Sequence, residues 1–133
     1  MTVERKRNIY ILAFALVALG VSFSFASLTT VSATPDAEIT IVARDMAFYI
    51  EGDPTPNPPL ELTAGSRTRV TFINYERGVQ HDLKFPELGL QTGLLNGDGS
   101  KAQLDILVPV GQSDSTYTCS LHVMMMTGAV TIR

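Results

Sequence analysis

The sequence predicts an all-β domain, a sandwich or barrel of about six to eight short strands, preceded by a separate N-terminal segment. Short runs rich in Val, Ile, Thr, Tyr and Phe recur through residues 34–133. Turn-forming residues separate these runs: Gly52–Pro59 has four prolines in eight residues, and Asn96–Ser100 reads NGDGS. No long stretch shows the 3.6-residue apolar spacing of an amphipathic helix.

The N-terminal segment, residues 1–33, is predicted to be a membrane anchor or a signal peptide. Three basic residues at positions 5–7 precede Asn8–Leu28, which has no charge and is long enough as a helix to cross a bilayer. The sequence VSA at Val31–Ala33 also fits signal-peptide cleavage. We favour a retained anchor because a signal-peptide apolar core usually spans only about 7 to 15 residues. The basic flank keeps the N-terminus cytoplasmic, so residues 34–133 are expected on the outer, periplasmic or extracytoplasmic, face of the cytoplasmic membrane.

Strands of the domain at residues 34–133 are expected wherever an apolar or β-branched run is bounded by Gly, Pro or Asn. Ser32–Ala37 reads as a short linker before the first of them. The expected strands are Glu38–Arg44, Met46–Ile50, Leu60–Thr63, Arg67–Asn74, Val79–Phe85, Ala102–Val108, Ser115–Cys119 and Thr127–Arg133.

Two chemically reactive side chains are predicted to point inward near strand ends. In the run VQHDLKF, Val79–Phe85, His81 shares a face with apolar residues because successive side chains of a strand alternate between its two faces. Asp82 falls on the opposite face. In STYTCS, Cys119 shares a face with Tyr117 at the end of its strand. An imidazole and a thiol are thus both expected to face the interior.

The domain at residues 34–133 is acidic, with seven Lys and Arg against twelve Asp and Glu and a formal net charge of −5. Nucleic acid is not an expected partner, because binding phosphates requires a basic surface. Cys119 is the only cysteine, which excludes an internal disulfide. A lone thiol outside the cytoplasm is either buried and inert or occupied as a metal ligand, and the composition leaves both open.

The stretch Tyr117–Gly128, YTCSLHVMMMTG, gathers the cysteine, one of two histidines and three of five methionines. Taken singly, a histidine on an apolar face is ordinarily a hydrogen-bonded core residue, and a methionine run ordinarily fills core gaps. Together, His81, Cys119, His122 and a methionine provide two imidazoles, a thiolate and a weak thioether. This donor set suits a copper ion that cycles between Cu(I) and Cu(II), whereas zinc sites usually avoid Met.

The same residues resemble a known family. Tyr117–Ile132, YTCSLHVMMMTGAVTI, resembles the copper loop of the cupredoxins, small blue-copper proteins such as plastocyanin, azurin and amicyanin. Gly78–Gly89 is similar to the segment that carries their first histidine. Ile39–Asn74 resembles their opening strands and those of the copper domain of cytochrome oxidase subunit II. The resemblance spans residues 36–133 and implies a cupredoxin-like Greek-key β-sandwich with one type 1 copper ion.

The resemblance also implies the ligands. It makes His81, Cys119 and His122 the strong ligands and Met126 the axial ligand. The spacing Cys-x2-His-x3-Met is shorter between His and Met than in plastocyanin and shorter between Cys and His than in azurin. The loop has no second cysteine for a binuclear centre.

Met126 is preferred over Met125 because of strand alternation, and over Met124 because Met124 lies only two residues past His122, too close for both to reach one metal. If the last strand begins near Thr127 and Val130 faces the core, Met126 continues the inward face and Met125 the outward one. Asp82 is expected to tie the His81 segment to the backbone near Ser120, the alternative being a solvated carboxylate.

The function that the resemblance implies is single-electron transfer, in a carrier or an electron-entry subunit whose partner is a cytochrome or a terminal oxidase complex. The edge of the His122 ring is expected at the surface, within an apolar docking patch formed by Pro86, Leu88, Leu90, Leu121, Val123 and Met124.

A copper carrier or sensor that uses the methionine run is the alternative function. A third reading, a metal-free adhesion sandwich, has to treat the presence of all four donor residues as coincidence. An enzyme is not expected, because both histidines are consumed by the metal and none is left as a general base.

Overall fold

The computed structural model describes residues 34–133. The predicted anchor or signal peptide, residues 1–33, lies outside the described residues. No helix within residues 34–133 is long and apolar enough to span a membrane.

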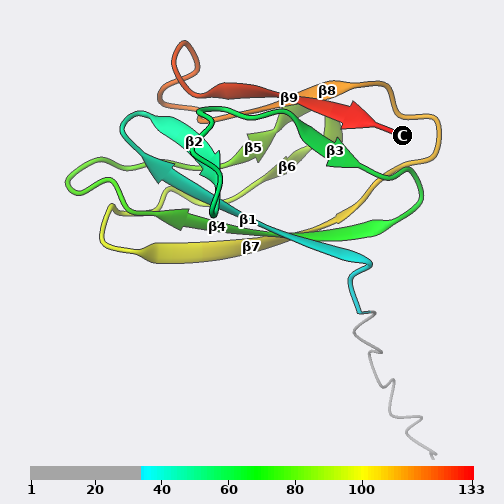
Figure 1. Ribbon diagram of the computed structural model, residues 1–133, viewed down its shortest axis with the longest axis horizontal. Helices are drawn as coiled ribbons and strands as arrows, with labels where there is room; N and C mark the ends of the chain where they lie inside the picture. Colours follow the sequence, from blue (N-terminus) through cyan, green and yellow to red (C-terminus); the bar gives the residue numbers. More distant parts are fainter. Residues whose placement is uncertain (1–33) are drawn as a thin grey trace, which may run out of the picture. The chain divides into compact units, whose positions relative to one another are not determined.

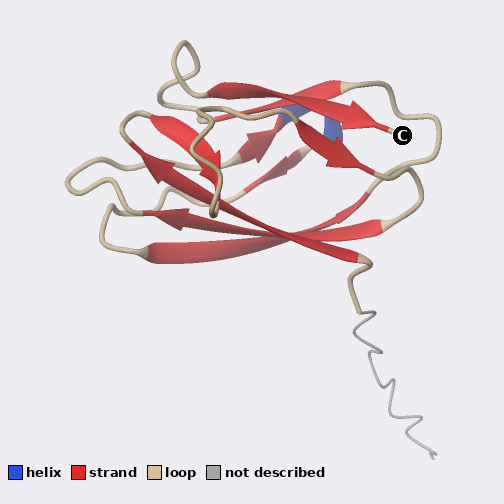
Figure 2. Cartoon of the chain, in the orientation of Figure 1, coloured by secondary structure: helices blue, strands red, loops and turns tan. Residues whose placement is uncertain are grey.

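The described residues form two β-sheets that stack face to face (Figure 1), so the predicted all-β architecture is confirmed. One sheet has the strand order β2-β1-β4-β7 and the other β3-β9-β8-β5-β6. Only one short 3-10 helix, η1, interrupts the strands between residues 34 and 133 (Figure 2). The elements are β1 Ala37–Arg44, β2 Ala47–Ile50, β3 Leu60–Leu62, β4 Arg67–Asn74, β5 Lys84–Phe85, η1 Pro86–Leu88, β6 Leu90–Gln91, β7 Ser100–Leu107, β8 Ser115–Thr118 and β9 Thr127–Ile132.

Strand β4 shows why these sequences form a sandwich. Its side chains alternate between half-buried and buried, with Val70 and Phe72 in the core. It pairs in parallel with β1 and antiparallel with β7, so it lies in the middle of its sheet. Its last residue, Asn74, is polar but fully buried, which places a hydrogen-bonding side chain at one end of the core.

Tyr117 joins the two sheets near the middle of the core. Its ring packs beside the rings of Phe48 and Phe85, and its hydroxyl donates a hydrogen bond of 2.6 Å to the carbonyl of Pro58. Gly128, opposite Tyr117 on β9, has no room for a side chain: a Cβ atom there would lie 2.3 Å from the Tyr117 ring. The glycine is thus required by the close approach of this ring.

The prediction of a strand over Val79–Phe85 is wrong for most of that range. Only its last two residues form β5, and His81 makes an isolated bridge to Leu95. Side chains take the place of a neighbouring strand: Asn74 donates to the carbonyl of Val79, and Thr92 accepts from the amide of Leu83. The prediction that His81, Leu83 and Phe85 point into the core is nevertheless confirmed.

Other boundaries differ by small amounts for local reasons. Met46, expected in a strand, lies in the tight turn between β1 and β2, where Asp45 and Met46 both adopt left-handed backbone angles, φ 51° and 56°. Such angles match the twist of a two-residue hairpin turn. Helix η1 and strand β6 were not expected, because Pro86 and Gly89 begin and end a turn too short to leave a periodic pattern.

Candidate metal centre

Three nitrogen and sulfur atoms converge at one end of the sandwich. Cys119 Sγ lies 3.6 Å from His81 Nδ1 and 3.6 Å from His122 Nδ1, and the two Nδ1 atoms are 3.1 Å apart. His81 comes from the loop after β4, and the other two come from the loop between β8 and β9. The structure therefore brings together the three residues that the sequence selected as strong metal ligands.

Cys119 occupies a fixed position directly after β8. Its amide donates to the carbonyl of Met126, and its carbonyl accepts from the amide of His122. The thiol is fully buried, and this burial raises its pKa above the ordinary value of a cysteine. A thiol in this environment stays protonated near neutral pH unless a bound cation displaces the proton.

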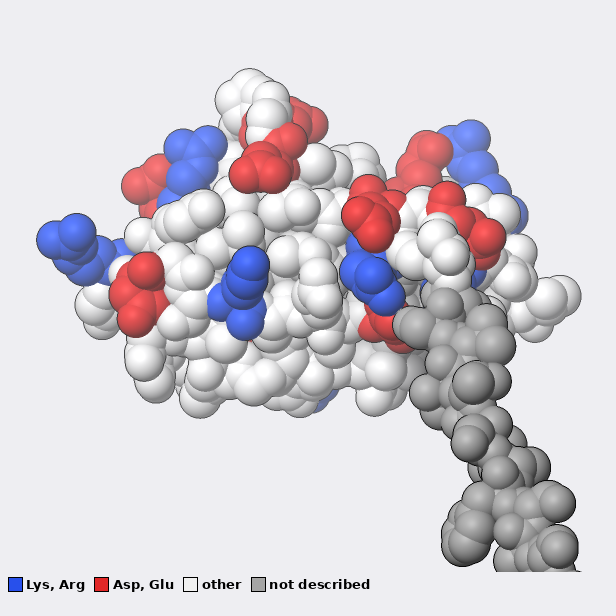
Figure 3. Space-filling model, turned by 90° about the horizontal axis from the view of Figure 1, so that it is seen from below, with Lys and Arg blue, Asp and Glu red and all other residues white. Residues whose placement is uncertain are grey.

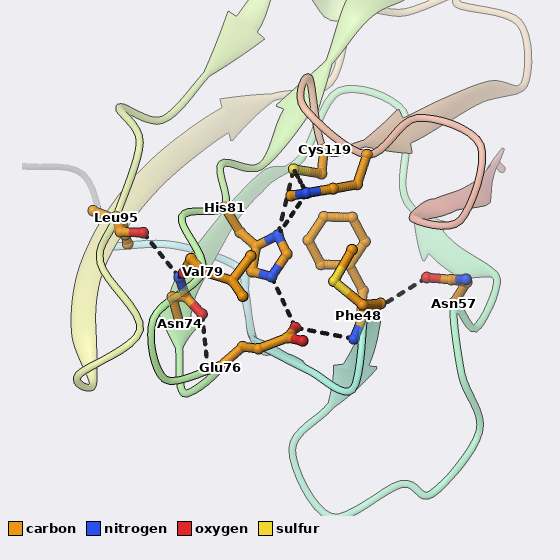
Figure 4. A network of polar contacts seen from close by, with 10 residues as sticks. Phe48, Asn57, Asn74, Glu76, Val79, His81, Leu95 and Cys119 are labelled. Atoms are coloured by element: carbon orange, nitrogen blue, oxygen red, sulfur yellow. Dashed lines mark hydrogen bonds and ion pairs between the residues drawn. The ribbon is translucent and has the colours of Figure 1, made fainter.

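His81 is held on both sides of its ring. Nδ1 faces Cys119, and Nε2 lies 2.8 Å from Oε2 of Glu76 (Figure 4). Its backbone is fixed too, since its amide and carbonyl exchange hydrogen bonds with Leu95. The side chain is completely buried, as predicted.

His122, in contrast, is half-buried on a loop with an apolar exterior. Leu121, Val123, Met124 and Met125 are all exposed around it, and with Ser120 they line a hollow in the surface. Two residues expected in this patch do not belong to its exposed part: Leu88 and Leu90 are half-buried and pack against the core.

The three methionines differ sharply in burial. Met124 is 96% exposed and Met125 52%, whereas Met126 is 0% exposed and packs in the same core cluster as Cys119. The amide of Met126 donates to the carbonyl of His122, so its backbone is tied to both neighbouring donor residues. Burial thus supports the strand-alternation reasoning that selected Met126.

Asp82 links the two donor segments, as predicted. Its Oδ1 accepts the amide of Ser120 at 2.7 Å, and its Oδ2 accepts the hydroxyl of Ser120 at 2.5 Å and the amide of Gln91 at 2.6 Å. Burial alone raises the pKa of Asp82, but the hydrogen bonds from Ser120, Gln91 and Cys119 outweigh it and leave the pKa below its ordinary value. The outward orientation expected from strand alternation is wrong, because Asp82 lies outside any strand and is fully buried.

The chemistry and spacing of the donors fit a metal ion. Three ligands in a plane, with metal–nitrogen bonds of about 2.0–2.1 Å and a metal–sulfur bond of about 2.3 Å, would place the nitrogens about 3.5 Å apart and the sulfur about 3.8 Å from each. The distances in the structure, 3.1 Å and twice 3.6 Å, are within half an ångström of this arrangement. Lone pairs that face one another at such distances repel unless a cation or a proton lies between them.

Sequence reasoning missed the residues that support His81 from behind, Glu76 and Asn74. Both come from the end of β4 and the loop after it, and no periodic pattern marks them. The only signal was an asparagine at an inward position of a strand face that also carries Val70 and Phe72. A buried polar residue at such a position needs hydrogen-bond partners. Here they are Glu76 and Val79 in the loop that carries His81, and Leu95 in the segment that bridges to His81.

No protein-family model matches this chain, and no curated protein sequence matches it.

Solved structures do match. Auracyanin B aligns with a TM-score of 0.59 and 19% identity, covering 75% of this chain and 91% of auracyanin B. Rusticyanin from Thiobacillus ferrooxidans aligns with a TM-score of 0.58 and 20% identity, covering 75% and 79%. Auracyanin from Roseiflexus castenholzii aligns with a TM-score of 0.58 and 15% identity, covering 73% and 96%. Auracyanin and rusticyanin are cupredoxins, so residues 34–133 have the cupredoxin fold that the sequence resembles.

Proposed function

We propose that this protein binds one type 1 copper ion and carries single electrons to or from a membrane complex. The convergence of one buried thiol and two imidazoles, with all donor atoms within 4.8 Å of one another, carries the proposal. His81, Cys119 and His122 would be the strong ligands and Met126 the axial ligand. A soft thiolate and thioether combined with two imidazoles is the donor set of electron-transfer copper sites.

Bound copper supplies a one-electron couple, and the protein's own residues supply a fixed and nearly dry environment for it. His81, Cys119 and Met126 are fully buried and exclude water. Asp82 ties the segment of His81 to Ser120 in the other ligand loop, so the two ligand segments are joined by direct hydrogen bonds. A site held in this way changes little when the charge of its metal changes.

Access for electrons is proposed through His122. It is the only one of the three converging donors that reaches the surface, and exposed Leu121, Val123, Met124 and Met125 surround it. An exposed apolar patch of this kind suits a partner protein that docks briefly. The face of the molecule seen in Figure 3 instead carries acidic and basic side chains interspersed with one another.

The cellular setting proposed is the outer face of the cytoplasmic membrane. The basic residues at positions 5–7 and the uncharged run Asn8–Leu28 support a retained anchor with the N-terminus inside. A tether of this kind raises the concentration of the copper site near a membrane-bound cytochrome or oxidase. Mass spectrometry of the native protein tests it: an N-terminus at Thr34 would show cleavage after Ala33 and a soluble carrier instead.

A copper carrier or sensor is the alternative function. The observation that favours it is the exposure of two thioethers, those of Met124 and Met125, beside the half-buried His122. Thioethers bind soft Cu(I) well. The burial of Cys119 and Met126 favours retention of the metal over its release.

A visible spectrum and an EPR spectrum of the Cu(II)-loaded protein test the proposal. We expect an intense thiolate-to-copper charge-transfer band and a compressed copper hyperfine coupling, both abolished in Cys119→Ala and both bleached reversibly by a reductant. Persistence of the band in Cys119→Ala contradicts the site. Loss of the metal to a Cu(I) chelator at each reduction, instead of reversible bleaching, favours the copper-handling alternative.

A further inference from the structure

A carboxylate lies directly behind the most deeply buried imidazole. Glu76 Oε2 is 2.8 Å from His81 Nε2, on the side of the ring that faces away from Cys119 (Figure 4). The His81 side chain is fully buried and that of Glu76 only 17% exposed. A hydrogen bond to a charged acceptor in so dry a place is strong, since little water competes for either partner.

Glu76 is itself held in place from both ends. Oε2 also accepts the backbone N–H of Met46 at 2.9 Å, and the backbone N–H of Glu76 donates to Asn74 Oδ1 at 2.9 Å. Because an ionised carboxylate only accepts hydrogen bonds, His81 Nε2 is assigned as the donor to Oε2. The imidazole then carries its proton on Nε2 and leaves the Nδ1 lone pair directed toward Cys119.

The surrounding backbone is shaped to keep this carboxylate where it is. Met46 points its N–H at Glu76 from a left-handed conformation, φ 56°, that non-glycine residues adopt at a cost. Asn74 donates to the carbonyls of Val79 and Leu95, both at 2.8 Å, and so binds the loop of His81 to the end of β4. Gly97 packs so closely that a Cβ atom there would lie 1.5 Å from the carbonyl oxygen of Glu76.

We propose that Glu76 is a positioning residue for His81, which fixes the Nε2–H tautomer and favours the oxidised state of the bound metal. The second part rests on the proposed copper function. The carboxylate contacts Nε2 and not the donor atom Nδ1, so its negative charge would act on a metal held at Nδ1 through the imidazole ring. A more electron-rich nitrogen binds Cu(II) more tightly than Cu(I), and thus lowers the reduction potential. No other acidic side chain contacts either imidazole among residues 34–133.

The experiment uses the full chain in metal-free and copper-loaded forms, with two matched variants. Glu76→Gln keeps the size of the side chain and removes its charge. Glu87→Gln is the control, because Glu87 also accepts a backbone N–H, that of Thr116, but contacts neither histidine. Imidazole ¹⁵N NMR of the metal-free wild type reports the tautomer of His81 without any copper. Competition titrations of the loaded protein report the affinities for Cu(II) and Cu(I).

We expect the metal-free wild type to carry the proton of His81 on Nε2. In Glu76→Gln the ratio of Cu(II) to Cu(I) affinity should fall about tenfold, which corresponds to a potential about 59 mV more positive, while Glu87→Gln should match the wild type. A proton on Nδ1 in the metal-free wild type overturns the positioning role, and an unchanged ratio in Glu76→Gln overturns the effect on the metal. If the wild type binds no copper, the proposed function fails, while the tautomer measurement still decides the role of Glu76 at His81.

Discussion

The two histidines reach the donor set from segments that are built in opposite ways. His81 is fully buried and is held by Glu76 and Leu95, through a side-chain and two backbone hydrogen bonds. His122 is half-buried in a short loop whose neighbouring side chains are apolar and exposed. The His81 side of the site is therefore fixed by hydrogen bonds, and the His122 side lies next to the exposed surface. A partner can approach His122 without disturbing the hydrogen bonds that hold His81.

The largest expected effect comes from removing each imidazole in turn. His81→Gly should destabilise the metal-free protein by about 3 kcal/mol, because it leaves a cavity and removes one of the two hydrogen-bond partners of the mostly buried Glu76 carboxylate. His122→Gly should cost less than about 1 kcal/mol, since its ring is half exposed and makes no comparable hydrogen bond. Urea unfolding of both variants measures the difference.

The same two variants also test access to the metal. Added imidazole should restore the charge-transfer band of copper-loaded His122→Gly, because the opening lies at the surface, but not that of His81→Gly. Equal rescue at both positions would contradict the contrast between the buried and the accessible side.

The next prediction tests whether the loop between β8 and β9, which carries His122, is fixed where it meets β9. Gly128 is the second residue of β9, and a Cβ atom there would collide with the Tyr117 ring. Gly128→Ala should therefore destabilise the protein by about 2 kcal/mol, by displacing a buried ring and its bond to Pro58. Gly93→Ala is the control, since nothing lies within 4 Å of a Cβ atom at that position. Thermal unfolding that is equal in the two variants would show that the end of the loop adapts.

The same contrast explains what the sequence could and could not predict. Most strands, the burial of Cys119 and the choice of Met126 as candidate axial ligand followed from alternation and from residue chemistry, which are local properties. His81 is buried as predicted, although most of its expected strand does not form. Glu76 was missed because it lies in a loop without a periodic pattern, and because the carboxylate that contacts His81 is held by the backbone N–H of Met46, thirty residues away in the chain. Asp82 was predicted as the link to Ser120 but placed on the wrong face, because side-chain hydrogen bonds replaced the strand there.

Methionine substitutions sharpen the boundary between the buried site and the exposed patch. Met126→Leu keeps the side-chain volume and should leave stability nearly unchanged, but as the proposed axial ligand its loss should shift the EPR parameters and the reduction potential. Met124→Leu should leave both unchanged, because Met124 is almost fully exposed. A silent Met126→Leu combined with an altered spectrum in Met125→Leu would show that the axial ligand is Met125.

The smallest expected effect comes from an exposed ion pair, that of Arg69 and Asp105, which contrasts with the mostly buried pair of Glu76 and His81. Asp105 on β7 accepts two hydrogen bonds from Arg69 on β4, and these bonds hold the pKa of Asp105 below its ordinary value. A lowered pKa adds stability that is present above the ordinary Asp pKa of about 3.9 and is lost as the pH falls through the folded-state pKa. Asp105→Asn should thus lower the melting temperature slightly at pH 7 and not at all at pH 2, and added salt should shrink the difference at pH 7, because water and ions screen an exposed pair. A difference that persists at pH 2 would mean that Asp105 acts through packing and not through its charge.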